Sequence, residues 1–197
     1  MTVIDAPVTD NPRPFPDQSL RDQALAQRFA TGDPVAFDQV VAEFAPRIGR
    51  LAHRLLNWGG DVDDVVQEVF VAALKRQRDF RGDSSLWTWL SAIAVNQCRS
   101  RLRRRKSWRR WVGFQRERHD QSPSPVVRDE TSERVRAAVA ELKQDDREVI
   151  VLFYLEDQSI RQIAEMLGKT GNAVEVRLHR ARRRLASLLK EFADDSR

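Results

Sequence analysis

The segment that most restricts how the chain can fold is residues 159–185, which read SIRQIAEMLGKTGNAVEVRLHRARRRL. Ser159 is followed three positions later by Gln162, the spacing of a capping box in which each side chain bonds the other residue's backbone N–H. Apolar residues then recur at helical spacing as far as Leu167, and Gly168 follows as a helix stop. The sequence therefore predicts a short amphipathic helix that ends in a tight turn.

A second, longer helix is predicted after a turn at residues 169–171. One face of it is an apolar stripe made of Val174, Leu178, Ala181, Leu185 and Leu188. The opposite face carries Asn172, Val176, His179, Arg180 and Arg183. Two helices joined by a tight turn, with a basic second helix, are typical of a helix-turn-helix that reads duplex DNA. The alternative is a solvated basic helix at the end of a small helical domain.

Composition limits the class of protein. The 197 residues are enough for one or two domains, and 41% apolar and 32% charged residues indicate helices with exposed polar faces. The net charge is +5, and the basic residues form two blocks, which favours a polyanionic partner. No apolar run approaches the ~18 residues of a membrane helix, and the start of the chain lacks signal-peptide features. We therefore expect a cytoplasmic protein without membrane insertion.

Cysteine and histidine usage predicts neither a disulfide nor a metal site. Cys98 is the only cysteine, and His53, His119 and His179 do not have zinc-ligand spacing. Cys98 is expected to be a small buried or half-buried residue, with a redox sensor as the alternative. Neither Ser84, Ser85 nor the aspartate cluster has the base or ligand pattern of a nucleic-acid enzyme, so we expect no catalysis, cofactor or small-molecule substrate.

Periodicity divides the chain into four parts. Residues 1–20 contain four prolines without a sustained period and predict a flexible tail. Residues 21–106 read as helices only, and residues 107–131 mix arginines, aromatics and Ser-Pro repeats like a linker. Residues 132–192 read as a second helical domain. The predicted fold is all-α, with two small helical domains joined by a flexible linker.

Residues 61–76, DVDDVVQEVFVAALKR, predict an amphipathic helix of unusual composition. On a helical wheel the core stripe is Val62, Val65, Val66, Val69 and Ala73, and the opposite side holds Asp61, Asp64 and Glu68. Three apolar residues, Phe70, Val71 and Leu74, fall outside the stripe, beside Asp63 and Gln67. An exposed patch with an apolar centre and an acidic rim suits a protein partner. The alternative is a wholly packed helix whose acids favour its macrodipole.

Residues 80–106 begin with a Gly-Asp-Ser-Ser loop, pass through two tryptophans and become densely basic from Arg99 onward. Aromatic rings beside a basic helix suit a protein that stacks unpaired bases while arginines follow the phosphates. The simpler alternatives are a core tryptophan, a disordered basic tail and a helix cap at Asp83. We expect Trp89 in the core and Trp87 nearer the surface.

These three segments, in this order, resemble the signature segments of the extracytoplasmic-function (ECF, group IV) sigma factors of bacterial RNA polymerase, over roughly residues 22–190. The resemblance implies docking of the acidic helix on the clamp helices of the largest polymerase subunit. The residues implied in core-polymerase binding are Asp61, Asp63, Asp64, Gln67, Glu68 and Phe70. It also implies contact with the flap of the second-largest subunit, a stress or envelope-response regulon, and an anti-sigma factor as partner.

The resemblance further implies promoter-DNA contacts in both domains. For melting of the −10 element and capture of a flipped base, the implied residues are Asp83, Ser84, Ser85, Trp87, Asn96, Arg99 and Arg103. For reading of the −35 element they are Asn172, Glu175, Val176, Arg177, His179, Arg180 and Arg183. Glu175 and Val176 stand where many members carry a basic and a hydroxyl residue, which predicts altered base readout. The alternative function is a stand-alone helix-turn-helix regulator that does not join polymerase.

Overall fold

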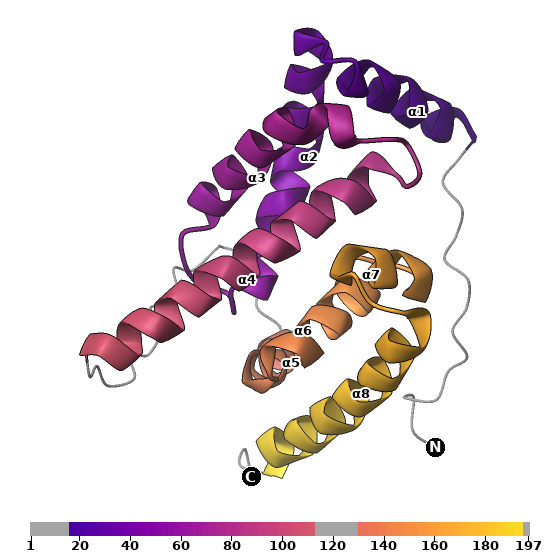
Figure 1. Ribbon diagram of the computed structural model, residues 1–197. Helices are drawn as coiled ribbons and strands as arrows, with labels where there is room; N and C mark the ends of the chain where they lie inside the picture. The colour runs from indigo at the N-terminus through magenta and orange to yellow at the C-terminus, as the bar shows by residue number, and fades with distance from the viewer. Residues whose placement is uncertain (1–15, 113–129, 195–197) are drawn as a thin grey trace. The chain divides into compact units, whose positions relative to one another are not determined.

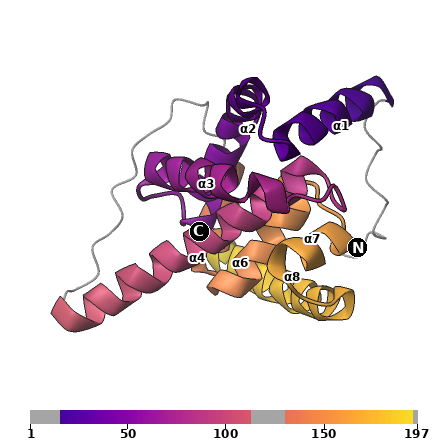
Figure 2. The same ribbon diagram turned by 45° about the horizontal axis from the view of Figure 1, so that its top comes forward.

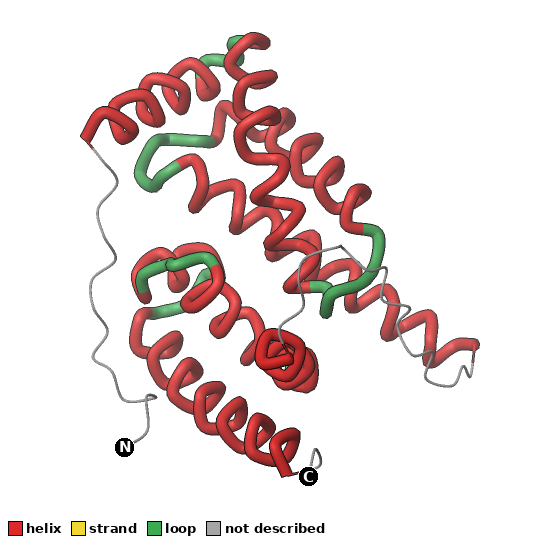
Figure 3. Tube along the Cα trace, turned by 180° about the vertical axis from the view of Figure 1, so that it is seen from behind, coloured by secondary structure: helices red, strands yellow, loops and turns green. Residues whose placement is uncertain are grey.

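The computed structural model describes residues 16–112 and 130–194. In both segments the chain consists of helices joined by short loops, and neither segment contains a strand (Figure 3). The predicted all-α fold is confirmed. The described helices fall into two compact units, one from each segment, and each unit has its own core.

The first unit contains four α-helices and one short 3-10 turn. Their bounds are α1 Pro16–Ala30, α2 Pro34–Leu55, α3 Val62–Arg76, η2 Gln77–Asp79 and α4 Leu86–Val112. The Asp33 carboxylate caps α2 by accepting a hydrogen bond from the Val35 N–H at 2.9 Å, and Pro34 occupies the first turn, where no N–H is needed. The helix continues through Pro46.

Helix α1 begins inside the segment for which a flexible tail is predicted. Residues 16–20 are helical, with Pro16 in the first position, so the tail prediction is wrong for these five residues. The rest of the predicted tail, residues 1–15, lies outside the described residues.

The core of the first unit lies where α2, α3 and α4 pack against one another. Its fully buried large side chains include Val40, Ile48, Leu51, Val65, Val69 and Leu90. Phe29 of α1 joins this core through Phe80 and Trp89, whose rings meet it edge to face at centroid distances of 6.3 and 5.8 Å. The aromatic contacts attach α1 and the loop after η2 to the helical core.

Helix α4 is longer than predicted. Residues 107–112, expected in the linker, continue it to Val112, and its C-terminal end projects past α2 and α3 (Figures 1 and 2). Arginine, lysine and leucine are good helix formers, which favours continuation of the helix through the basic run. The linker residues 113–129 lie outside the described residues.

The second unit is built around its last helix. The elements are α5 Glu130–Glu141, α6 Gln144–Ile150, the π-helical turn η3 Val151–Leu155, α7 Ile160–Leu167 and α8 Gly171–Asp194. Helices α5, α6 and α7 all pack against α8. The predicted apolar stripe of α8 provides this contact: Val174, Leu178, Ala181 and Leu188 are buried and Leu185 is half-buried.

A buried arginine closes the end of α5. Arg147 is 8% exposed, and its guanidinium donates to the backbone carbonyls of Ala140 at 2.9 Å, Leu142 at 2.8 Å and Val139 at 3.3 Å. Burial lowers the pKa of Arg147, while the Glu148 carboxylate acts in the opposite direction. The side chain satisfies C-terminal carbonyls that a helix leaves without partners.

Two expectations from composition concern the described residues directly. Cys98 lies on α4 with 2% of its surface exposed, which confirms that it is a small buried residue. Among the helices described, none is both long enough and apolar enough to cross a membrane.

Candidate functional site

The helix-turn-helix predicted from the sequence is present in α7 and α8. The Ser159 hydroxyl accepts from the Gln162 N–H at 3.3 Å, and the Gln162 side chain accepts from the Ser159 N–H at 2.9 Å, which confirms the capping box. Gly168 ends α7 with φ of 61°, a conformation that glycine adopts at little cost. The Thr170 hydroxyl accepts from the Ala173 N–H at 3.3 Å, so α8 begins at Gly171, inside the predicted turn.

The outer face of α8 carries every residue assigned to the −35 element. Asn172, Glu175, Val176, Arg177, His179, Arg180 and Arg183 are all exposed. The first turns are acidic and apolar, with Val176 51% exposed, and the arginines accumulate further along. Arg177 differs from the rest, because its Nη1 lies 3.0 Å from Asp145 and 3.3 Å from Asp146, both in the first turn of α6.

The acidic side of α3 faces a cation of α4. The Arg101 guanidinium lies 3.0 Å from Asp61, 3.1 Å from Asp64 and 3.3 Å from Glu68. Arg105 adds a contact of 3.7 Å to Asp61. The Arg101 side chain is 16% exposed, so these pairs are partly shielded from water. Three of the acids assigned to polymerase binding are therefore engaged within the chain.

The exposed apolar patch predicted on α3 is smaller in the structure than the sequence indicated. Phe70 is only 6% exposed, so its predicted place in an exposed patch is wrong. Both α2 and α4 pack on α3, and two neighbours bury a wider arc than the single stripe that the wheel assumes. Val71 and Leu74 remain 46% and 47% exposed, so the alternative of a wholly packed helix is also wrong. Together with the exposed Asp63 and Gln67 they form the open face of α3.

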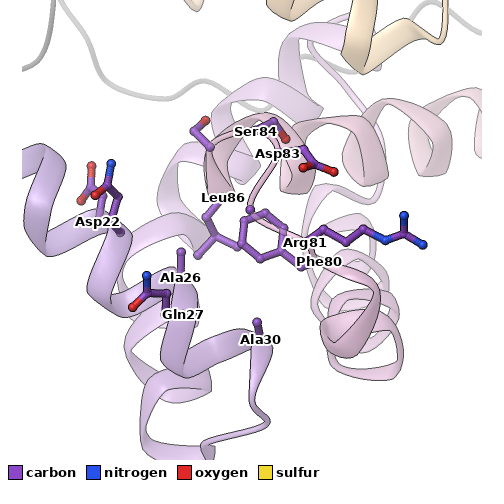
Figure 4. A pocket seen from close by; sticks show the side chains of 12 residues that line it. Asp22, Ala26, Gln27, Ala30, Phe80, Arg81, Asp83, Ser84 and Leu86 are labelled. Atoms are coloured by element: carbon purple, nitrogen blue, oxygen red, sulfur yellow. The ribbon is translucent and has the colours of Figure 1, made fainter.

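The loop before α4 forms one wall of a hollow, and α1 forms the other (Figure 4). Its volume is about 610 Å³, and Asp83, Ser84 and Ser85 line it opposite Asp22 and Gln27 of α1. The Ser85 hydroxyl accepts from the Thr88 N–H at 3.0 Å. Ser85 is thus the cap of α4, the structural role considered for Asp83, while the exposed Asp83 side chain remains available to a ligand.

The two tryptophans in the first turn of α4 are placed opposite to expectation. Trp87 is 7% exposed, stacks on Phe44 at a centroid distance of 6.3 Å and lies under the Arg47 guanidinium at 3.7 Å. Trp89 is half-buried and meets Phe80 edge to face at 5.6 Å. The expectation of a surface Trp87 is wrong, because its side of α4 faces α2, and Trp89 lies at the edge of the core, less buried than Trp87.

The remaining residues assigned to the −10 element lie along α4. Asn96 and Arg103 are exposed and Arg99 is half-buried, and steps of three and four residues place them on one helical face. Lys106 extends this face by one turn and is exposed as well. The face is polar and positively charged, which suits contact with a phosphate backbone.

Sequence reasoning missed the intramolecular partners of these charged residues. Arg101 and Arg105 are four residues apart, and the three acids of α3 are spaced by three and four, so each set lies on one helical face. That spacing was a usable signal for a contact between two helices. Asp145 and Asp146 gave no comparable signal, because their contact with Arg177 depends on how α6 packs against α8.

Both units match described sequence families. Residues 40–109 match Sigma-70 region 2, and residues 132–185 match Sigma-70, region 4. The chain is 32% identical over 176 residues to the ECF RNA polymerase sigma factor SigM of Mycobacterium tuberculosis, which covers 85% of this chain and 84% of SigM. The chain belongs to the ECF RNA polymerase sigma factors. It is also 33% identical over 177 residues to the RNA polymerase sigma factor NccH of Alcaligenes xylosoxydans, covering 86% of this chain and 95% of NccH.

Solved structures agree with this sigma-factor assignment. CnrH in complex with the cytosolic domain of CnrY matches with a TM-score of 0.65 and 33% identity, over 86% of this chain and 97% of CnrH. The sigma factor RpoE of Bartonella quintana, in complex with the anti-sigma factor NepR, matches with a TM-score of 0.66 and 26% identity, over 78% of this chain and 96% of RpoE.

The sigma factor binds core RNA polymerase, recognises the −10 and −35 promoter elements and promotes DNA melting at initiation. The region 2 match gives the first unit a task within polymerase, so a stand-alone helix-turn-helix regulator is not favoured.

Proposed function

We propose that the sigma factor docks on core polymerase through the open face of α3, and not through all the acids that the resemblance implies. The observation that carries this proposal is the division of α3 into an acidic side that Arg101 contacts and an open side that no residue of α4 pairs with in the described part of the chain. Asp61, Asp64 and Glu68 are held by Arg101, whereas Asp63 and Gln67 border the exposed Val71 and Leu74. An apolar centre with a polar rim is the usual composition of a protein interface.

A double variant tests the docking surface. Val71→Ser with Leu74→Ser should weaken binding to core polymerase at least about tenfold, because both substitutions remove apolar area that docking would bury, at about 25 cal/mol per Å². Val35→Ser is the matched control, since Val35 is 59% exposed on α2. Helix content should be unchanged in both. Wild-type core affinity of the double variant would exclude this face as the docking surface.

We propose that the hollow between α1 and the Asp83–Ser85 loop receives the flipped base of the −10 element. Its volume of about 610 Å³ exceeds that of a nucleobase, and Asp83 and Ser84 offer hydrogen-bonding groups at its edge. Asn96, Arg99 and Arg103 on α4 would follow the phosphates of the separated strand. Unstacking costs a few kcal/mol per base, which these contacts must offset without ATP. Trp87, also implied by the resemblance, is buried against Phe44 and Arg47 of α2 and is not among the residues that line the hollow.

Binding of single-stranded −10 DNA tests the hollow. Asp83→Ala should weaken binding of the holoenzyme to a single-stranded non-template oligonucleotide while leaving core-polymerase binding unchanged. Asp79→Ala removes an exposed carboxylate of η2, outside the residues that line the hollow, and serves as control. Equal effects of the two substitutions would mean that the hollow does not hold the base.

We propose that α8 separates base reading from phosphate binding along its length. Asn172, Glu175 and Val176 lie in its first turns, the part that enters the major groove in helix-turn-helix proteins, and Arg180 and Arg183 lie further along. Glu175→Ala should change the preferred −35 sequence by roughly 1–3 kcal/mol at one position. Arg183→Ala should weaken binding to all sequences alike and lower the salt slope by about 1. An unchanged rank order of promoter variants for Glu175→Ala would exclude Glu175 from base reading.

Further partners follow from the similar structures. CnrH and RpoE are each seen with a bound partner, CnrY and the anti-sigma factor NepR. We propose that an anti-sigma factor likewise sequesters this chain, and that the chain acts in the cytoplasm, where polymerase and promoter DNA are found.

The polymerase flap is a further expected partner. Tyr154 and Leu155 of the π-helical turn are our candidates for this contact, because their side chains are 47% and 37% exposed.

A further inference from the structure

The contact between Arg177 and α6 sets this residue apart from the other cations of α8. Nη1 of Arg177 lies 3.0 Å from Oδ2 of Asp145 and 3.3 Å from Oδ1 of Asp146. The Asp146 contact has hydrogen-bond geometry. The Arg177 side chain is 45% exposed, so the guanidinium stands at the surface while two carboxylates fix one of its ends.

This arrangement leaves one edge of the guanidinium open. Both carboxylates contact Nη1, and within the described residues no acid reaches the edge formed by Nε and Nη2. That edge presents two parallel N–H groups. Guanine offers two neighbouring acceptors, O6 and N7, in the major groove, and an arginine fork matches them with two hydrogen bonds.

The charge of the cluster disfavours a phosphate as the partner of Arg177. Two carboxylates oppose one guanidinium, so the three side chains together carry a charge of −1. A phosphate approaching this point meets net repulsion, whereas a base edge is neutral and gains two directional hydrogen bonds. Arg180 and Arg183, further along α8, have no carboxylate contact among the described residues and remain suited to phosphates.

We propose that Asp145 and Asp146 are positioning residues for promoter recognition: they hold Arg177 so that its Nε–Nη2 edge reads a guanine of the −35 element, and they keep it from binding phosphate. The inference rests on the proposed reading of that element by α8. Specificity is the difference between the affinity for the promoter and the affinity for other DNA, and the carboxylates affect both affinities. They favour the correct base and lower the affinity for random DNA.

The test uses holoenzyme assembled from the full-length chain. Asp145→Asn with Asp146→Asn keeps the shape of both side chains and removes their charge. Dissociation constants are measured on the promoter, on promoters with each guanine of the −35 element replaced, and on random duplex DNA at several salt concentrations. The double variant should bind random DNA more tightly, with a salt slope steeper by about 0.9 if Arg177 gains one phosphate contact. Discrimination at one guanine should fall roughly five- to hundredfold.

Arg177→Ala completes the experiment. It should lose the same discrimination without reducing the salt slope, and adding the two Asn substitutions to it should change discrimination no further. Glu191→Gln, which removes an exposed carboxylate near the end of α8, is the charge control and should leave discrimination intact. Thermal unfolding of each variant verifies the fold.

Three outcomes would overturn the inference. These are unchanged discrimination in the double Asn variant, an effect of the Asn substitutions that persists in the Arg177→Ala background, and a salt slope that falls by about 0.9 on Arg177→Ala. If Arg177→Ala has no effect while Glu175→Ala alters the preferred sequence, the inference fails but reading by α8 stands. If no exposed residue of α8 affects the preferred sequence, the proposed function of α8 fails as well.

Discussion

The Arg101 guanidinium on α4 lies 3.1 Å from the Asp64 carboxylate on α3, and the same group also reaches Asp61 and Glu68. One cation thus joins three acids that follow one another along a single face of α3. The cluster adds polar contacts between α3 and α4 to the buried apolar contacts of the two helices. Arg103, two residues further along α4, is exposed on the basic face of that helix.

The first prediction concerns this cluster. Arg101→Ala should lower the free energy of unfolding of the first unit by about 1–2 kcal/mol, because the guanidinium is largely buried while Asp61 and Asp64 remain 60% exposed and screened by water. The difference from wild type should shrink in 1 M salt, where screening acts over ~3 Å. Chemical denaturation at low and high salt measures both effects.

Arg103→Ala is the matched control for that experiment. Arg103 lies two residues further along α4, is exposed and belongs to the face assigned to DNA. Its removal should leave stability within about 0.5 kcal/mol of wild type and weaken promoter binding. If both substitutions lowered the free energy of unfolding equally, the contacts of Arg101 with the acids of α3 would contribute nothing specific to stability.

The second prediction concerns the buried indole of α4. Trp87 is 7% exposed between Phe44 and Arg47, so Trp87→Ala should destabilise the first unit by about 3–5 kcal/mol. Trp108, 64% exposed on the projecting end of the same helix, is the control, and Trp108→Ala should change stability by less than about 0.5 kcal/mol. Denaturation followed by circular dichroism measures both. If Trp87→Ala lowered the free energy of unfolding by less than about 1 kcal/mol, Trp87 would not be packed in the core, and the expectation from the sequence of a position nearer the surface would stand.

Features that depend on neighbouring residues were predictable from the sequence. The capping box of Ser159 and Gln162 and the left-handed Gly168 require only a few consecutive residues, and both are present. The same holds for the buried stripe of α8, because a period of 3.6 residues places Val174 and Leu178 on one side of any straight helix. Helix type and the place of the tight turn thus follow from local chemistry.

Features that depend on packing between distant segments were not predictable in this way. Phe70 is buried because α3 has neighbours on two sides, which a wheel of one helix cannot show. Trp87 and Trp89 are two residues apart on one helix, but Trp87 packs on Phe44 of α2 and Trp89 packs on Phe29 of α1, so different helices cover the two rings. The pairing of Arg101 with Asp61 spans 40 positions of sequence. Periodicity indicates which face is apolar, but not which partner covers it.

The third prediction is a pH dependence at Glu43. Partial burial raises the pKa of the Glu43 carboxyl on α2, and the Asp22 carboxylate of α1 raises it further. The folded chain therefore binds this proton more tightly than the unfolded chain, and the stability it gives is lost as pH rises from the ordinary glutamate value through the raised one. Glu43→Gln should be more stable than wild type at neutral pH, and the difference should disappear in acid. Unfolding free energies measured as a function of pH would contradict this if Glu43→Gln were the less stable protein at neutral pH.

The last prediction compares two glycines of the first unit. Gly60, in the loop before α3, has φ of 98°, and a Cβ added there would lie 2.7 Å from Nη2 of Arg105. Gly60→Ala should therefore destabilise by about 1–3 kcal/mol, since it combines backbone strain with displacement of an arginine that contacts Asp61. Gly49 lies within α2, where an added Cβ would meet Val66 at the ordinary contact distance of 3.7 Å. Gly49→Ala should stabilise by about 0.5–1 kcal/mol, because alanine loses less conformational entropy in a helix. Thermal unfolding of the two variants should shift in opposite directions. An unchanged or raised midpoint for Gly60→Ala would contradict the strain argued for that loop, and a lowered midpoint for Gly49→Ala would contradict the fit of a methyl group beside Val66.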